Sequence, residues 1–360
     1  MGRRNKGSDY TLGGYFFLMP NFLGFMLFVL LPVLASLALS FCRWHIFNDP
    51  RPVFNGLSNF KEIMWVHYED VPVTEKVRGE DGTQTERPVM RASMAADGTT
   101  SQVPLTKRKL RLNDPDFWYY FYNTVFLMLG IPIGMALSLM LALLLNKGIR
   151  AIKIFRMVYF LPTVSSGVAL LVLWLVIYNP QYGLFNYMLS RIGIVGPNWL
   201  SGGIKSEWLS KFGIDPMCYW SKVALMIMGL WNGIGGYNMI LYLAGLQGIN
   251  PELYEAADVD GATGWKKFWN ITWPMLSPTT FFSFIMSLIG GFQGGFESAY
   301  VMTEGGPAGS TTTISYQIFN ELYVRNRAGY ASSIAWFLFA VVFVLTMVSW
   351  RYGGKVVHYD

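Results

Sequence analysis

The stretch ELYEAADVDGATGWKKFWNITWP, Glu252–Pro274, is a charged segment that lies between two long apolar runs. Its start carries helix signals, because Asn250–Glu252 supply a capping asparagine, a proline for the first turn and an acid beside the helix N-terminus. Gly261 can end that helix, and Trp265–Trp273 forms a second, amphipathic stretch. The pattern predicts two short helices that meet at a glycine bend and lie across one face of a membrane.

The apolar runs on both sides of this segment belong to a larger set. Hydrophobic residues make up 52% of the 360-residue chain and charged residues 14%, whereas soluble domains average about 25% charged residues. A membrane span needs about 20 mostly apolar residues. The chain is therefore predicted to be an all-α polytopic membrane protein with six transmembrane helices, which are Tyr15–Phe41, Trp118–Leu145, Ile154–Tyr178, Ser221–Gly245, Met275–Met302 and Tyr330–Trp350.

Basic residues in the short connections set the expected orientation. The N-terminus, MGRRNKGSDY, has three bases, and the loop at 146–156, NKGIRAIKIFR, has four bases and no acid. Short basic loops stay in the cytoplasm, so we expect both chain termini and segment 247–274 there. The expected organisation is a cytoplasmic N-terminus with the first span (1–41), an external segment (42–117), a core with the other five spans (118–350) and a cytoplasmic tail (351–360).

Part of the external segment carries hairpin signals. The stretch TEKVRGEDGTQTERPVMR alternates around Asp81-Gly82, and RASMAADGTTSQVPL alternates around Asp97-Gly98. Asp-Gly between alternating residues favours a tight hairpin turn. A small β-rich lobe is therefore expected at 66–112, between the first two spans, and a disordered loop is the alternative.

Other kinds of chemistry find little support in the composition. The formal charge of +6 fits bases that flank spans, so no nucleic-acid partner is expected. Cys42 and Cys218 make no metal cluster, although a bridge between them stays open. The sequence has no G-x-x-x-x-G-K-[ST] loop and no clustered catalytic residues, so we expect a chain that is no enzyme and holds no ATP, cofactor or metal of its own.

The first helix of the opening segment is acidic, with Glu252, Glu255, Asp258 and Asp260. A helix across a membrane face can anchor to lipid, connect two spans or dock a partner. Acids are repelled by an anionic inner leaflet. Docking to a partner protein with basic residues is therefore favoured over lipid anchoring, while a plain connector stays open.

The spacing within this segment resembles a known signature. Glu255-Ala256-Ala257, three residues, Gly261, nine residues, Ile271, two residues and Pro274 look like the EAA motif of permease subunits of bacterial ABC importers. The fuller form is similar to the carbohydrate branch, the maltose-type and glycerol-3-phosphate-type permeases, with Trp273 where that branch usually has Leu. The stretches LAGLQGINPELYEAA and MTEGGPAGSTTT agree with it. The resemblance covers the first span and residues 117 onward, but not the hairpin lobe.

The resemblance implies the type I ABC importer permease fold in a bacterial plasma membrane. It implies four kinds of partner: a second six-span permease, in a heterodimer; two ABC ATPase subunits that bind ATP and Mg²⁺; an external or periplasmic solute-binding protein; and a sugar. In this family the first EAA helix enters a cleft of the ATPase, and closure of the ATPase dimer rocks the spans. The residues that the resemblance assigns to ATPase coupling are Glu252, Glu255, Ala256, Ala257, Asp260 and Gly261.

The path for the sugar is expected on the fourth and fifth spans, in GLWNGIGGYNMILY and GGFQGGFESAYVM. Polar groups inside a membrane usually face a cavity or a partner, and aromatic rings with amide and carboxyl groups suit a carbohydrate. Packing between helices is the alternative for each of them. The candidate path residues are Asn232, Tyr237, Asn238, Gln293, Phe296, Glu297 and Tyr300.

External surfaces are expected to receive the solute-binding protein. The candidates are Glu304–Thr313, the hairpin lobe and Asn179–Trp220, where short interfacial helices would hold Trp199 and Trp208 near the lipid headgroups. A secondary, ion-coupled transporter is the main alternative function. It would usually show several intramembrane charges and an internal repeat, whereas Glu297 is the one acid in the predicted spans. The sequence does not identify the sugar.

Overall fold

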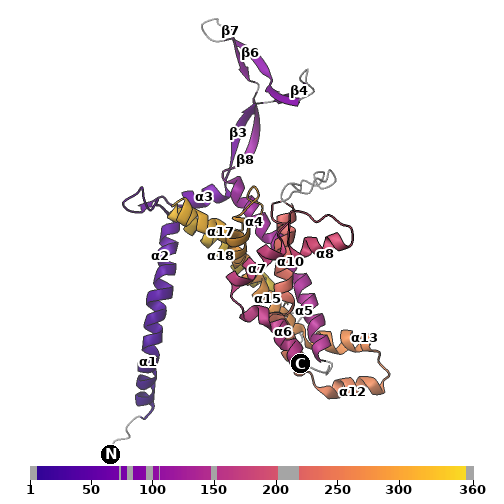
Figure 1. Cartoon of the computed structure of the whole chain (residues 1–360). Coiled ribbons are helices and arrows are strands. Elements are labelled where there is room, and N and C mark those ends of the chain that lie inside the picture. The colour runs from indigo at the N-terminus through magenta and orange to yellow at the C-terminus, as the bar shows by residue number, and fades with distance from the viewer. Residues whose placement is uncertain are drawn as a thin grey trace, which may run out of the picture.

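The computed structural model describes residues 6–72, 74–78, 84–94, 100–104, 106–146, 152–201 and 219–353. A bundle of helices carries an insert of strands at one end, and a separate first helix stands beside the bundle (Figure 1). By length and apolar composition, four helices can cross a membrane, and two bent helix pairs raise the number to six if each pair is one span. The helical, membrane-spanning class predicted from the sequence is confirmed.

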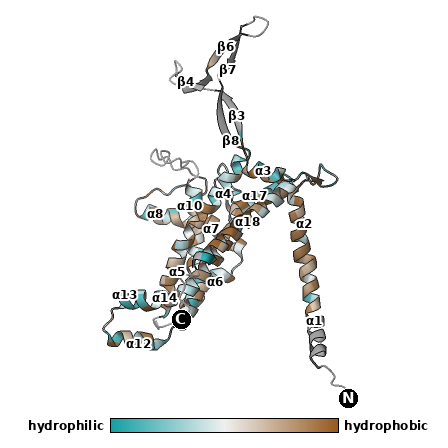
Figure 2. Cartoon of the chain, turned by 180° about the vertical axis from the view of Figure 1, so that it is seen from behind, coloured by the Kyte–Doolittle hydropathy of each residue, from teal (hydrophilic) through white to brown (hydrophobic). Residues whose placement is uncertain are grey.

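The first span consists of α1 (Lys6–Phe25), a π-helical turn η1 (Met26–Leu30) and α2 (Leu31–Ser40). Most of its apolar stretch Gly14–Ser40 is exposed, although Ser40 at the end is buried, and Figure 2 shows the hydrophobic α2 standing clear of the bundle along most of its length. Contact is made near its end, where the Ser333 hydroxyl donates to the carbonyl of Ser40 (2.9 Å). Lipid or a partner protein must therefore cover most of this helix.

The second and sixth spans are close to their predicted ranges. The second consists of α4 (Pro115–Met128) and α5 (Gly130–Asn146), and the sixth is α18 (Ala328–Gly353). The side chain of Asp114 caps α4 by accepting the backbone N–H of Phe117 at 3.0 Å. A buried cluster that includes Phe117, Phe292 and Ile334 joins these spans to the fifth.

The third, fourth and fifth spans are interrupted within their predicted ranges. The third bends by 100° between two helices, because Pro162 withholds a backbone N–H in the turn before the break. Glycine pairs interrupt the other two, Gly235-Gly236 and Gly294-Gly295. The pieces are α6 (Ile152–Val164) and α7 (Gly167–Ile177); α10 (Tyr219–Ile234) and α11 (Tyr237–Gln247); and α15 (Ser277–Gln293), α16 (Phe296–Ser298) and the π-helical turn η4 (Ala299–Thr303).

The segment that opened the sequence forms two helical arms, as predicted. The first arm is α12 (Pro251–Val259). The second is α13 (Gly264–Lys267), continued by the π-helical turn η3 (Phe268–Thr272) and α14 (Trp273–Met275). Figure 1 places both arms at the end of the bundle opposite the strands, which is also the end where α1 begins and α18 stops.

The insert between the first two spans is built from antiparallel strand pairs. Its base holds β1 (Cys42–Arg43), β2 (Val53–Phe54) and α3 (Ser58–Met64). Strands β3 (Val66–Pro72) and β8 (Thr106–Leu112) then pair from Val66↔Leu112 to Pro72↔Thr106. The predicted bounds 66–112 are those of these strands. Two further pairs lie between them, namely β4 (Thr74–Arg78) with β5 (Gln84–Pro88) and β6 (Met90–Met94) with β7 (Thr100–Pro104). The two Asp-Gly turns lie outside the described residues.

Ion pairs fasten the base of the insert to the loop between the fifth and sixth spans. That loop holds α17 (Ile314–Phe319) and the π-helical turn η5 (Asn320–Val324). The fully buried Glu321 pairs with Arg325 (2.6 Å) and Arg327 (2.7 Å). Arg327 also reaches Glu62 of α3 at 2.8 Å. The insert is therefore connected to the bundle through charged side chains as well as through the chain itself.

The structure also bears on the predictions for the two interfacial tryptophans and the two cysteines. Trp199 is buried and donates its indole N–H to Asn186 of α8 (Leu184–Arg191) at 2.8 Å, so its side chain packs within the chain, and its level relative to the headgroups stays a prediction. Trp208 lies outside the described residues. Cys42 carries a free thiol, and Cys218 is also outside the described part of the chain.

Candidate functional site

The start and the end of α12 are formed by the residues that the sequence singles out. The Asn250 side chain accepts the backbone N–H of Glu252 at 3.1 Å, and its amide donates to the Glu252 carboxylate at 3.1 Å. At the other end, Gly261 has φ +70°, a left-handed conformation that L side chains adopt at a cost. A capped start and a glycine stop therefore define a short helix with a sharp bend after it.

The predicted coupling residues lie together on the surface of α12 and the bend. Glu252, Glu255, Ala256, Asp260 and Gly261 are exposed, and Ala257 is half-buried. None of the residues of α12 is buried within this chain. An acidic helix with small side chains at its centre is thus open to a partner along most of its length.

The second arm holds α12 in place. The hydroxyls of Tyr254 and Thr272 are hydrogen bonded at 2.9 Å, and Lys267 forms an ion pair with Asp258. Tyr254 also packs, together with Phe268, against a buried cluster. The two arms therefore form one compact unit.

The buried cluster beneath the arms connects them to two spans. Its members come mainly from α5 and α11, and they are Met135, Leu139, Ala142, Leu145, Met239, Tyr242, Leu243, Leu246, Ile249 and Leu276. Close-packed interiors transmit displacement. A force on α12 therefore reaches the second and fourth spans through side-chain packing.

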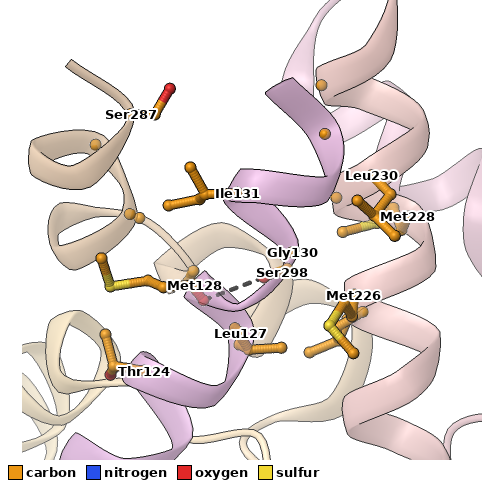
Figure 3. Close-up of a pocket in the computed structure, with 18 of the residues that line it drawn as sticks. Thr124, Leu127, Met128, Gly130, Ile131, Met226, Met228, Leu230, Ser287 and Ser298 are labelled. Carbon is orange, nitrogen blue, oxygen red and sulfur yellow. Dashed lines mark hydrogen bonds between the residues drawn. The ribbon is translucent and has the colours of Figure 1, made fainter. Parts of the chain in front are cut away.

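A first cavity lies deeper in the bundle, between α4–α5, α10 and α15, as Figure 3 shows. It has a volume of about 450 Å³, and methionines, leucines and glycines line most of it. At its edge the Ser298 hydroxyl donates to the carbonyl of Gly295 at 3.2 Å. Of the seven predicted path residues, Asn238 is the one that lines this cavity.

A second cavity of about 410 Å³ adjoins the first one and brings four predicted path residues together. Asn232 of α10 meets Gln293, Phe296 and Glu297 of the broken fifth span there. Residues of α7 complete the lining. The two cavities share five lining residues, which are Met228, Gly229, Gly294, Gly295 and Ser298.

The second cavity has the chemistry that a saccharide needs. Asn232, Gln293 and Glu297 are exposed and offer amide and carboxyl groups, while Trp174 and Phe296 supply aromatic rings. Since an exposed carboxylate is costly in hydrocarbon, this face must meet water or protein. The arrangement can accept hydrogen bonds from hydroxyl groups and stack on a sugar ring.

Three predicted path residues do not line the second cavity, and two of them already contact other side chains. Tyr237 is 59% exposed and lines neither cavity. Tyr300 stacks on Phe296, with ring centroids 5.6 Å apart. Asn238 accepts the Ser283 hydroxyl at 2.6 Å and donates to Ser287 at 3.3 Å. The Asn238 amide thus joins the fourth span to the fifth, and its role in the path stays a prediction.

Sequence reasoning missed how the break in the fifth span builds the cavities. Gly295 has φ +82°, and a β-carbon there would meet Thr313 at 2.6 Å. The left-handed turn and the close approach both require glycine. The Gly-Gly pair after Gln293 was the signal for this break.

The segment Glu304–Thr313, expected to meet a solute-binding protein, is largely packed into the bundle. Ser310, Thr311, Thr312 and Thr313 are buried. Asn123 of α4 donates to the carbonyls of Gly309 (2.9 Å) and Thr312 (3.0 Å). Glu304 and Ala308 are the exposed positions of this segment, so only its first half offers a surface to another protein.

A family model and several known proteins match this chain. The family model described as "Binding-protein-dependent transport system inner membrane component" matches residues 124–352, from the second span through the sixth. The lactose transport system permease protein LacF of Rhizobium radiobacter is 38% identical over 243 residues, which cover 66% of this chain and 76% of LacF. The probable ABC transporter permease protein YesP of Bacillus subtilis is 27% identical over 355 residues, 97% of this chain and 93% of YesP.

The chain is also similar to a solved structure over nearly its whole length. That structure is a bacterial alginate ABC transporter in complex with an alginate pentasaccharide-bound periplasmic protein. Its similar chain has a TM-score of 0.69 and 21% sequence identity, with coverage of 97% of this chain and 96% of that chain. At this identity the likeness concerns the fold, which includes the region of the strand insert.

Proposed function

Because this chain belongs to the family of binding-protein-dependent transport system inner membrane components, we propose that it is the membrane-spanning permease subunit of an ATP-driven ABC importer. It moves a sugar or oligosaccharide that an external solute-binding protein delivers. The family match over residues 124–352 carries this conclusion, and relatives such as LacF support the sugar.

The acidic α12 is the docking element for an ABC ATPase subunit. Exposed Glu255 pairs with a basic residue at the rim of the ATPase cleft, and Ala256 lets the two backbones approach closely. ATP and Mg²⁺ bind the ATPase, not this chain. Support comes from the exposure of α12 and from the packing of Tyr254 and Phe268 on the cluster of α5 and α11. Closure of the ATPase dimer then moves the arms and spans as rigid bodies.

The sugar passes the face where the second cavity opens. Asn232, Gln293 and Glu297 bond its hydroxyl groups there, and Phe296 stacks on its rings. One chain supplies half of the path, and a second six-span permease supplies the other half, in a heterodimer. The end of the bundle that carries the arms faces the cytoplasm, together with both chain termini. The strand insert and the exposed start of Glu304–Thr313 face the solute-binding protein.

Reconstitution tests this function directly. The chain is co-purified with its partner permease, the ATPase pair and the binding protein, and uptake into proteoliposomes is followed with radiolabelled sugars. A panel screened by calorimetry on the binding protein selects the sugars. Uptake should require both ATP and the binding protein. Uptake driven by a proton or sodium gradient without the ATPase would overturn the proposal and favour the ion-coupled transporter, an alternative that the family and the relatives do not support.

A further inference from the structure

A third cavity lies next to the arms, where the second and fifth spans meet the second arm. It has a volume of about 760 Å³, within the range of about 300–1,000 Å³ for ligand pockets. The second span lines it with Pro132–Leu143, the fifth with Phe284, and the second arm with Phe268 and Trp273. None of the predicted coupling or path residues lines it.

The depth of this cavity matches one half of a bilayer. Its lining on α5 runs from Pro132 to Leu143, which at 1.5 Å per residue is about 17 Å along the helix. One leaflet contributes about 15 Å to a hydrocarbon core of about 30 Å. The cavity is therefore about as long as one leaflet is deep, which is the depth that an acyl chain occupies.

Three tryptophans mark the mouth of the cavity as the interface between lipid and water. The rings of Trp265 and Trp269 lie 5.7 Å apart, and those of Trp269 and Trp273 lie 6.0 Å apart. All three are exposed, and exposed tryptophans gather at the level of the headgroups. The cavity opens just below this level.

The walls of the cavity continue into exposed apolar surface. Met140 is 60% exposed, and Phe284 also reaches the surface. An unfilled apolar cavity forfeits van der Waals contacts that a neighbouring molecule can supply. On a face bathed in hydrocarbon, the molecule at hand is a lipid chain.

Two exposed basic residues lie on the helical segments that contribute Phe268 and Gly353 to the cavity. Lys266 lies two positions before Phe268, and Arg351 lies two positions before Gly353, which also lines the cavity. Both basic residues are exposed, and no acid lines the cavity. Basic residues at one membrane face attract anionic headgroups.

We infer that the cavity holds one acyl chain of an anionic phospholipid from the leaflet on the side of the arms. Lys266 and Arg351 attract the headgroup from the same end of the bundle, and the chain runs along α5 towards Pro132. This lipid touches Phe268 and Trp273 of the second arm, so it lies between the docking element and the spans.

Photolabelling of the whole importer in nanodiscs tests the inference. The probe is phosphatidylglycerol with a diazirine in the middle of one acyl chain, and mass spectrometry locates the labelled peptides. Label should concentrate on Met135, Met140 and Phe284. Ala136→Phe places a ring in the cavity and should lower that label about five-fold, a loss of ~1 kcal/mol in binding free energy. Ala340→Phe, the same change on exposed α18 outside the cavity, should leave it unchanged.

Two further measurements keep the test decisive if Ala136→Phe assembles poorly. Unlabelled phosphatidylglycerol should compete better than phosphatidylcholine, and the double variant Lys266→Gln, Arg351→Gln should remove that preference. Label spread evenly over exposed apolar residues, including those of α1 and α2, would overturn the site. So would a disulfide between Met140→Cys and the partner permease, because that protein would then cover the cavity.

Discussion

The carboxylate of Glu297 lies against Gly167, so closely that a β-carbon built on Gly167 would sit 2.9 Å from Oε2. Gly167 begins α7, the second half of the broken third span. The first N–H groups of a helix have no intrahelical acceptor and carry partial positive charge. The Ser166 side chain gives α7 no cap. Glu297 thus joins the break in the fifth span to the break in the third.

The first prediction is that this pairing controls transport more than stability. In Gly167→Ala the new methyl group must displace the tip of a flexible side chain, so unfolding should change by less than about 0.5 kcal/mol. The displaced carboxylate leaves both α7 and the second cavity. Sugar uptake by the reconstituted importer should therefore fall about ten-fold, equivalent to ~1.4 kcal/mol.

The control for this prediction is Gly24→Ala, because a β-carbon there meets nothing within 4 Å. It should leave uptake as it is. Glu297→Gln should resemble Gly167→Ala, and Glu297→Asp, which keeps the charge, should recover part of the uptake. If Glu297→Gln transports normally, the carboxylate has no role in the path.

The second prediction concerns the bend between the two arms. Gly261 and Gly264 both have open space where a β-carbon would go, but only Gly261 has a positive φ, +70°. An L residue in that conformation costs about 1–2 kcal/mol. Gly261→Ala should therefore tilt α12 and lower transport-coupled ATP hydrolysis, while Gly264→Ala should not. Equal rates in the two variants would show that the bend does not matter for coupling.

The third prediction tests the docking role of α12 through its charge. Glu255→Lys should leave membrane insertion intact but separate ATP hydrolysis from uptake, because a base would face the basic rim proposed for the ATPase cleft. Glu255→Gln removes the charge without reversing it and should give an intermediate loss. The measurement is the number of sugars transported per ATP hydrolysed. Wild-type values in Glu255→Lys would contradict docking through this residue.

Local signals predicted the arms and the hairpins well. Asn250 and Gly261 act within one turn of their own helix, so their chemistry can be read without knowing the fold. The pairs β4–β5 and β6–β7 follow from alternation around short turns, which is also local, whereas the pairing of β3 with β8 joins distant residues. The bounds of the second and sixth spans follow from apolar length alone.

The breaks and the path were harder to predict because they depend on contacts between distant segments. Hydropathy predicts one apolar run at Ile154–Tyr178, whereas in the structure its two helices are bent by 100°. The sequence shows Gly295 only as a small residue, because the close contact with Thr313 that requires glycine exists only in the folded chain. Asn238 looked like a path residue, and its bonds to Ser283 and Ser287 arise only when the fourth and fifth spans meet. A polar residue in a span therefore signals a partner without saying which one.

The last prediction concerns the ion pairs between the insert and the bundle. Burial alone would lower the pKa of Arg327, but hydrogen bonds and charge from Glu321 and Glu62 raise it above its ordinary value. Because the pKa of Arg327 is higher in the folded protein than in the unfolded protein, its stabilising contribution is fully present at every pH below the unfolded-state pKa. The contribution of Arg327 therefore persists across ordinary pH. Arg327→Ala leaves the fully buried Glu321 with Arg325 alone, and should cost about 3 kcal/mol. Arg325→Ala, which removes the more exposed partner, should cost less.

Thermal unfolding of the purified complex in detergent, measured at pH 7 and pH 9, checks this prediction. The shift for Arg327→Ala should be larger than the shift for Arg325→Ala and should be the same at both pH values. Because Arg327 also holds Glu62 of α3, proteolysis should then release the insert from Arg327→Ala before it cuts the wild type. If both variants unfold like the wild type, the charged cluster adds nothing to stability. The insert would then be held by its strands and by the Trp118 indole, which donates to the carbonyl of Ile63 at 3.0 Å.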